Sequence, residues 1–103
     1  MGVDFRSTER SDSTPTGKGR RLGIVCARWN DVITRRMLRG VWDELAATGV
    51  DAGDVELVWV PGAFEIPLAA REMAATGRFD AVITLGCVIR GDTAHFEYVA
   101  GPA

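Results

Sequence analysis

Residues 81–96 have the sequence AVITLGCVIRGDTAHF, in which a short apolar run leads into a turn bounded by two glycines. The run at 81–85 is rich in β-branched residues, which is typical of a strand buried on both faces of a parallel sheet. The glycines predict a sharp turn, because glycine tolerates backbone conformations that other residues avoid. Asp92 or Thr93 then fits the N-cap of a helix. A strand, a glycine turn and a helix N-terminus together predict an anion-binding site.

Two further apolar runs, residues 22–27 and 55–60, have the length and composition of buried strands. A helical pattern follows each run, so the predicted order is β-α-β-α-β-α. This order indicates an α/β domain over residues 22–103, with parallel strands joined by right-handed crossovers and helices on the faces of the sheet. Residues 1–21 are rich in Ser, Thr, Asp, Arg and Gly, and they are predicted to form a flexible N-terminal arm.

The first helix is predicted at residues 32–48, where an apolar residue recurs at every fourth position and Gly49 ends the pattern. Asn30 or Asp31 fits its N-cap, since both side chains accept hydrogen bonds from the free N–H groups of a first helical turn. The apolar face of this amphipathic helix is expected to comprise Ile33, Met37, Val41 and Leu45, with Leu38 and Trp42 beside them.

The second helix is predicted to begin near Pro67, whose missing N–H costs nothing in a first turn, and to end at Gly77. Its apolar positions are expected to pack against the face of the sheet. The residues of this helix expected to face the core are Leu68, Ala69, Met73 and Ala74.

Composition narrows the classes of function. The 103 residues suffice for one domain, and 12 basic against 14 acidic residues leave a net charge of −2, which does not favour nucleic acid or an anionic membrane as a partner. No apolar run approaches the length of a membrane-spanning helix, and the first residues lack a hydrophobic signal core, so a cytoplasmic location is expected. The sequence also lacks a phosphate-binding loop of nucleotide triphosphatases, a dinucleotide fingerprint and a serine hydrolase elbow.

The two cysteines, Cys26 and Cys87, each fall at the end of a predicted strand. Reduced thiols are favoured over a disulfide, because nothing in the sequence indicates secretion. One histidine and no Cys-x-x-Cys spacing leave a structural zinc site without ligands.

Polar and aromatic residues cluster where the three predicted strands end, at 29–30, 62–65 and 87–95. Ligands of parallel sheets bind outside these carboxyl ends, so the clusters predict one site. Trp29 would stack on a heteroaromatic ring, or simply pack at the rim of the domain. Glu65 would accept hydrogen bonds from sugar hydroxyls, or only favour the start of the second helix. His95 would transfer protons beside the predicted anion site, or only hydrogen-bond a loop.

Two stretches resemble the signature sequences of lumazine synthases: VWVPGAFEIP at 58–67 and GCVIRGDTAHF at 86–96. The resemblance covers residues 22–99 and implies a flavodoxin-like three-layer α/β/α fold. It also implies a transferase of riboflavin biosynthesis, which condenses 5-amino-6-ribitylamino-uracil with 3,4-dihydroxy-2-butanone 4-phosphate and releases phosphate and water. Members use no metal or organic cofactor, and they form pentamers or larger shells built from pentamers.

The resemblance also implies roles for individual residues. It places the pyrimidine ring of the first substrate against Trp29. It places the edge of that ring against backbone groups of Cys87, Val88 and Ile89. It places the ribityl chain against Ala63, Phe64 and Glu65. The phosphate of the second substrate meets Asp92, through its backbone N–H, and Thr93, while His95 transfers protons.

Family members continue through a fourth strand and further helices, whereas this chain ends at Gly101-Pro102-Ala103. The sequence is therefore expected to be truncated at its C-terminal side. A second hypothesis follows, in which the chain is an inactive binding or assembly subunit that keeps the fold and the pocket without turnover. A third is a flavin- or phosphate-binding module of flavodoxin type.

Overall fold

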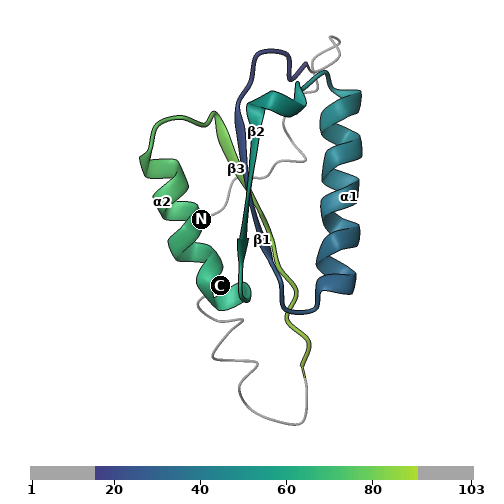
Figure 1. The fold of residues 1–103 in the computed structure, drawn as a ribbon, viewed down its shortest axis with the longest axis vertical. Coiled ribbons are helices and arrows are strands. Elements are labelled where there is room, and N and C mark those ends of the chain that lie inside the picture. Colours follow the sequence, from purple (N-terminus) through teal and green to yellow (C-terminus); the bar gives the residue numbers. More distant parts are fainter. Residues whose placement is uncertain (1–15, 91–103) are drawn as a thin grey trace, which may run out of the picture.

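The computed structural model describes residues 16–90. Within them a three-stranded parallel sheet lies between two helices, α1 on one face and α2 on the other (Figure 1). The predictions made for residues 1–15, and for the turn and helix after Arg90, lie outside the described residues. The predicted α/β fold is confirmed for the part that the structure describes.

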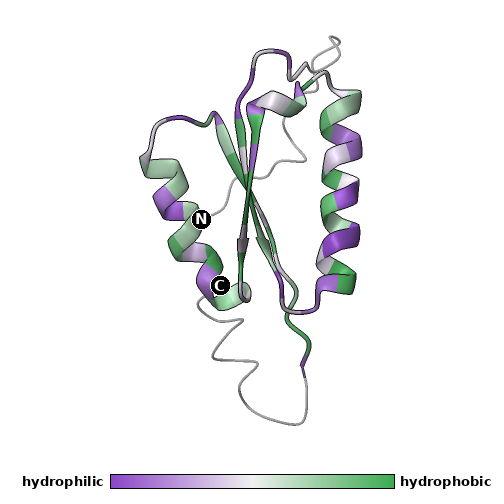
Figure 2. Cartoon of the chain, viewed as in Figure 1, coloured by the Kyte–Doolittle hydropathy of each residue, from purple (hydrophilic) through white to green (hydrophobic). Residues whose placement is uncertain are grey.

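The strands are β1 (Leu22–Ala27), β2 (Val55–Val60) and β3 (Ala81–Leu85), with the bounds expected from the sequence. Their order is β2-β1-β3, and both neighbours run parallel to β1. The four residues from Ile24 to Ala27 in this central strand are 0% exposed. The strands are largely apolar (Figure 2). A strand that is covered on both faces has a continuous apolar sequence, and for this reason the bounds could be predicted.

Helix α1 spans Asp31–Ala47 and packs on one face of the sheet. Its buried residues are Thr34 and Leu38, with Val41, Trp42 and Leu45 partly buried against the same cluster. Of the predicted apolar face, Leu38, Val41, Trp42 and Leu45 are thus confirmed, whereas Ile33 and Met37 are 41% and 38% exposed and do not belong to it. Positions spaced by four residues drift about 40° around a helix at each step, so a series of four cannot stay on one face.

Helix α2 spans Ile66–Ala75 on the opposite face and follows a short 3₁₀ turn, η3, at Ala63–Glu65. Ile66 and Met73 are buried there with Val25, Ala27, Val60 and Ala63. Leu68 is 66% exposed and Ala74 is exposed as well, so the prediction that they face the core is wrong. Both helices end as predicted, because Gly49 and Gly77 adopt φ angles of 89° and 70° that favour glycine.

Residues 16–21 hydrogen-bond to the rest of the domain. The Gly17 N–H donates to the Thr48 carbonyl at 2.8 Å, and Arg21 and Asp80 exchange two hydrogen bonds of 2.8 and 2.7 Å. These contacts hold the segment that leads into β1 against the amino-terminal end of the sheet.

Candidate active site

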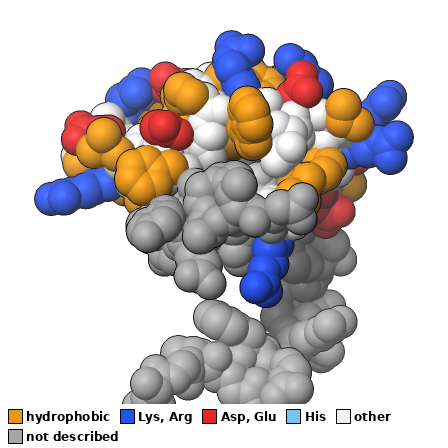
Figure 3. Space-filling model, turned by 90° about the horizontal axis from the view of Figure 1, so that it is seen from below, with side chains coloured by type: hydrophobic (Ala, Val, Ile, Leu, Met, Phe, Trp, Pro, Cys, Tyr) orange, Lys and Arg blue, Asp and Glu red, His pale blue; other side chains and the backbone are white. Residues whose placement is uncertain are grey.

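A pocket of about 390 Å³ opens at the carboxyl ends of the three strands. Three loops form it: a first loop after β1 (residues 28–30), a second after β2 (61–65) and a third after β3 (86–89). Figure 3 looks onto this end of the molecule, where apolar side chains gather among charged ones. The residues that line the pocket are Trp29, Asn30, Pro61, Gly62, Ala63, Phe64, Glu65, Cys87, Val88 and Ile89.

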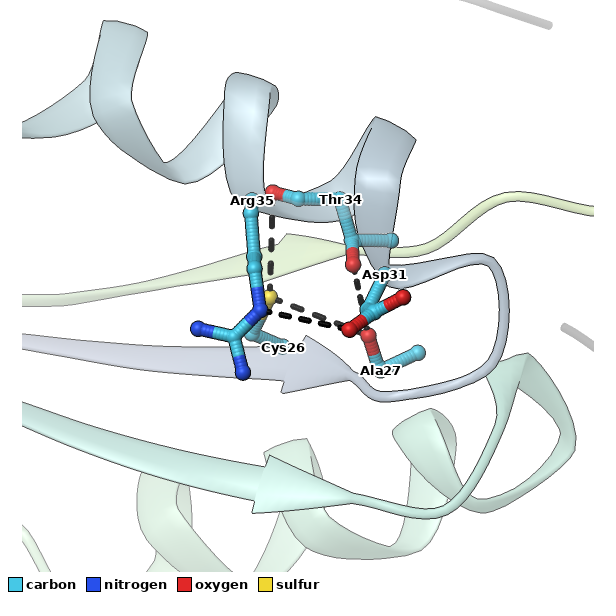
Figure 4. A network of polar contacts seen from close by, with 5 residues as sticks. All are labelled: Cys26, Ala27, Asp31, Thr34 and Arg35. Atoms are coloured by element: carbon cyan, nitrogen blue, oxygen red, sulfur yellow. Dashed lines mark hydrogen bonds and ion pairs between the residues drawn. The ribbon is translucent and has the colours of Figure 1, made fainter.

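The first loop is anchored by buried polar contacts between β1 and α1 (Figure 4). The Thr34 hydroxyl, 0% exposed, donates to the Ala27 carbonyl at 2.8 Å. The Cys26 thiol lies 4.0 Å from the Thr34 carbonyl, and within the first turn of α1 the exposed Arg35 pairs with Asp31 at 3.3 Å. The contacts of Thr34 hold the start of α1 over the end of β1, and three residues connect the two elements.

Asn30 occupies the N-cap position of α1, as predicted, but its side chain does not cap the helix. Its backbone is left-handed, with φ 61° and ψ 45°, and its side-chain Nδ2 donates instead to the Cys87 carbonyl at 3.3 Å. The helix begins with backbone bonds alone, from the N–H groups of Ile33 and Thr34 to the Asn30 carbonyl. The predicted side-chain cap is therefore wrong, and the amide joins the first loop to the third.

Trp29 presents its indole ring to the pocket and is 71% exposed. Its backbone N–H donates to the Pro61 carbonyl at 2.9 Å, and the preceding Arg28 N–H donates to the Val60 carbonyl at 2.8 Å. These bonds continue the β1–β2 pairing beyond the strands. The backbone beneath the ring is thus fixed while the face of the ring remains open to a planar ligand.

The second loop places Phe64 and Glu65 at the pocket and buries Ala63 beneath them. One carboxylate oxygen of Glu65, Oε2, accepts a hydrogen bond from the Gly62 N–H at 3.0 Å. The other, Oε1, has no hydrogen bond to another residue within 16–90. The carboxylate thus closes its own loop, while Glu65 also lines the cavity.

The third loop depends on Gly86 for close packing. A Cβ atom there would lie 2.7 Å from Ile66 Cδ1 and 3.4 Å from Ala63 Cβ. Gly86 does not adopt a positive φ, so the predicted need for an unusual backbone conformation is wrong. The missing side chain instead lets the third loop lie against the start of α2, which brings Cys87, Val88 and Ile89 to the pocket.

The two cysteines are free, as expected, but their surroundings differ. Cys26 lies in the core beneath α1, where burial raises the pKa of its thiol, opposed by a hydrogen bond with Thr34 and by the charge of Arg35. Cys87 is partly exposed at the pocket. Residues 16–90 contain no group of three His, Cys, Asp or Glu side chains placed to hold a metal ion.

Every predicted site residue within residues 16–90 lines this one pocket: Trp29, Ala63, Phe64, Glu65, Cys87, Val88 and Ile89. The predicted Asp92, Thr93 and His95 lie outside the described residues. Asn30 and Gly62, which fall in the predicted clusters without an assigned ligand contact, also line the pocket, and the structure adds Pro61.

In the order β2-β1-β3 the chain first adds β2 on one side of β1 and then crosses to add β3 on the other side. The space between β1 and β3 is therefore a topological switch point. A parallel sheet of this order, with a helix on each face, defines a flavodoxin-like α/β protein, and its pocket lies at the crevice where such folds bind ligands.

Residues 19–103 match the family model described as 6,7-dimethyl-8-ribityllumazine synthase. The chain therefore belongs to the lumazine synthase family, whose members act in riboflavin biosynthesis as transferases.

Proposed function

We propose that this chain condenses 5-amino-6-ribitylamino-uracil with 3,4-dihydroxy-2-butanone 4-phosphate to 6,7-dimethyl-8-ribityllumazine. The observation that carries the proposal is the pocket itself. In a chain of this family, one cavity collects the open indole of Trp29, the carboxylate of Glu65 and the backbone of the third loop. These groups match, in turn, a flat pyrimidine ring, a polyhydroxylated side chain and the polar edge of the ring.

Each wall of the pocket supports one part of this assignment. The indole of Trp29 offers an apolar face for stacking, and its 71% exposure leaves that face accessible. Glu65 Oε1 accepts hydrogen bonds from ribityl hydroxyls, with Ala63 and Phe64 beside the chain. The peptide groups from Cys87 to Ile89 supply donors and acceptors for the ring edge.

The proton transfers are assigned to His95, which follows the third loop closely in the sequence. An imidazole with a pKa near neutrality both gives and takes protons. The reaction requires such transfers three times: when the amine and the ketone form an imine with loss of water, when phosphate is eliminated, and when the ring closes. Asp92, through its backbone N–H, and Thr93 are assigned to the phosphate.

The test is an assay of lumazine fluorescence with the purified chain and both substrates. His95→Asn should slow turnover by about 10²–10⁴-fold, the usual contribution of a general acid–base group. Trp29→Ala should weaken binding of a ribityl-pyrimidine analogue, and Trp29→Phe should retain most of it because the aromatic face remains. An unchanged rate in the His95 variant would contradict the role assigned to that residue.

Binding without turnover is the outcome that would favour the second hypothesis, an inactive binding or assembly subunit. The chain would then hold the ribityl-pyrimidine analogue in defined oligomers while forming no product. Tight binding of a flavin phosphate, without binding of the pyrimidine, would favour a flavin-binding module instead. Either result contradicts the proposed condensation.

We also infer that the chain forms homo-oligomers, with the pentamer as the expected unit. The family model supports assembly, and so does the surface of α1. Val32 is 70% exposed, and Ile33 and Met37 of the same helix are 41% and 38% exposed. Exposed apolar side chains of this size are common where subunits meet.

The location and the domain division remain predictions from the sequence. No helix within residues 16–90 has both the length and the apolar character needed to cross a membrane. We expect a cytoplasmic protein with an N-terminal arm over residues 1–21 and an α/β domain over 22–103.

A further inference from the structure

The three loops of the pocket are joined to one another by different kinds of contact. The first and second loops are linked through the backbone, by the bonds from Arg28 to Val60 and from Trp29 to Pro61. The pairing of β1 with β3 stops at Cys26 and Leu85. Beyond it, within residues 16–90, the hydrogen bond from Asn30 Nδ2 to the Cys87 carbonyl is what joins the first loop to the third.

Asn30 is suited to this link because its backbone and its side chain serve separate purposes. It is the single non-glycine residue with a positive φ among residues 16–90. This conformation costs most residues about 1–2 kcal/mol, and asparagine is among the few that adopt it readily. With α1 started by the Asn30 carbonyl, the side-chain amide is free to reach across the crevice.

The bond to Cys87 also orients the group that follows. The Cys87 carbonyl and the Val88 N–H belong to one planar peptide unit, so a partner that fixes the carbonyl fixes the direction of the N–H. Cys87 and Val88 line the same pocket as Trp29, which precedes Asn30 in the chain. One residue thereby determines the placement of an aromatic wall and of a polar wall.

We propose that Asn30 is a positioning residue, which sets the separation between the Trp29 ring and the backbone of the third loop. This inference rests on the proposed function for its choice of ligand, since a pyrimidine would be held between these two walls. Loss of the amide leaves the third loop without its polar tie to the first. The pocket then holds the ring edge less well, although the chemistry assigned to His95 is not altered.

The experiment separates the side chain from the backbone conformation. Asn30→Gly keeps the left-handed backbone accessible and removes the amide. Asn30→Asp keeps much of that tolerance but places a carboxylate against the Cys87 carbonyl. The matched control is Thr76→Val, which removes a side-chain hydrogen bond to the Met73 carbonyl of 2.7 Å at the far end of α2.

Two readouts are measured on the folded chain. In Asn30→Gly, calorimetry should show the ribityl-pyrimidine analogue binding about three- to tenfold more weakly, as expected for one neutral hydrogen bond. The KM for the pyrimidine should rise similarly, while kcat and the KM for the butanone phosphate change less than twofold. The Asp variant should lose at least as much affinity, and the control should match the parent.

The second readout needs no ligand. A thiol reagent should modify Cys87 several-fold faster in both Asn30 variants than in the parent or the control, because the third loop opens more often. Unchanged labelling of Cys87 in Asn30→Gly would overturn the inference, whatever the chain binds. A parent chain that binds no pyrimidine would instead overturn the proposed function, and the labelling rates would still decide the role of Asn30.

Discussion

Cys26 couples the stability of the fold to pH through a single buried thiol. It is 0% exposed, and burial raises its pKa above the ordinary value of 9.0, although Thr34 and Arg35 act in the other direction. The folded chain therefore holds this proton more tightly than the unfolded chain does. Cys26 should therefore add no pH dependence to the free energy of unfolding below the unfolded pKa, and that free energy should fall as pH rises from the unfolded pKa through the folded pKa.

Cys26→Ala should abolish this alkaline loss of stability. The substitution lowers stability at neutral pH, since it leaves space in the core, but the difference from the parent should shrink as pH rises from 8 to about 10.5. Urea unfolding followed by circular dichroism at several pH values would measure it. Cys87→Ala is the matched control, and its free energy of unfolding should fall with pH as steeply as that of the parent. If the free energy of unfolding of Cys26→Ala falls just as steeply, Cys26 is not the group responsible.

At the scale of elements, what could be predicted depended on whether the deciding contacts are local. The strands could be bounded from the sequence because apolar runs covered on both faces are continuous. The inward faces of the helices could be predicted only in part, since overlapping apolar series compete and contact with the sheet selects one of them. The link from Asn30 to Cys87 spans 57 positions, so no local pattern reports it. The pocket walls were nevertheless predictable, because strand ends of a parallel sheet share one edge.

The contact of the third loop with α2 predicts a coupled pair of substitutions. Gly86→Ala should cost about 1–3 kcal/mol by overpacking against Ile66. Ile66→Val removes the Cδ1 atom that lies 2.7 Å from the new methyl group, so in the Gly86→Ala chain it should restore stability rather than reduce it further.

A double-mutant cycle by urea unfolding measures this coupling. Gly40→Ala is the matched control, because nothing lies within 4 Å of a Cβ there, and it should stabilise the mid-helix position by about 0.5–1 kcal/mol. If the changes in the free energy of unfolding caused by the Gly86 and Ile66 substitutions are additive, the third loop is not in tight contact with α2.

On the scale of the whole molecule, large apolar side chains are exposed near the pocket end of the domain. Val32 of α1 is 70% exposed and Leu68 of α2 is 66% exposed, and Trp29 and Phe64 are exposed at the pocket. A small domain gains by covering such surface in an assembly.

Val32→Glu together with Met37→Glu should therefore reduce the mass of the assembly in solution, as measured by light scattering. A carboxylate at Val32 lies in the first turn of α1, where it favours the helix, so folding should be preserved. Ala46→Glu adds one charge to the exposed side of the same helix near its other end and should leave the mass unchanged. An unchanged mass in the double variant would place subunit contacts elsewhere.

The three indoles of the chain have different access to solvent. Trp42 and Trp59 pack against the cluster beneath α1, and the guanidinium groups of Arg28 and Arg35 lie 5.2 and 4.9 Å from the centre of the Trp59 ring. Trp29 stands 71% exposed at the pocket. A dissolved quencher should therefore reduce chiefly the emission of Trp29, and a ligand that covers this ring should protect it. The unlabelled protein would then report its own occupancy by its fluorescence.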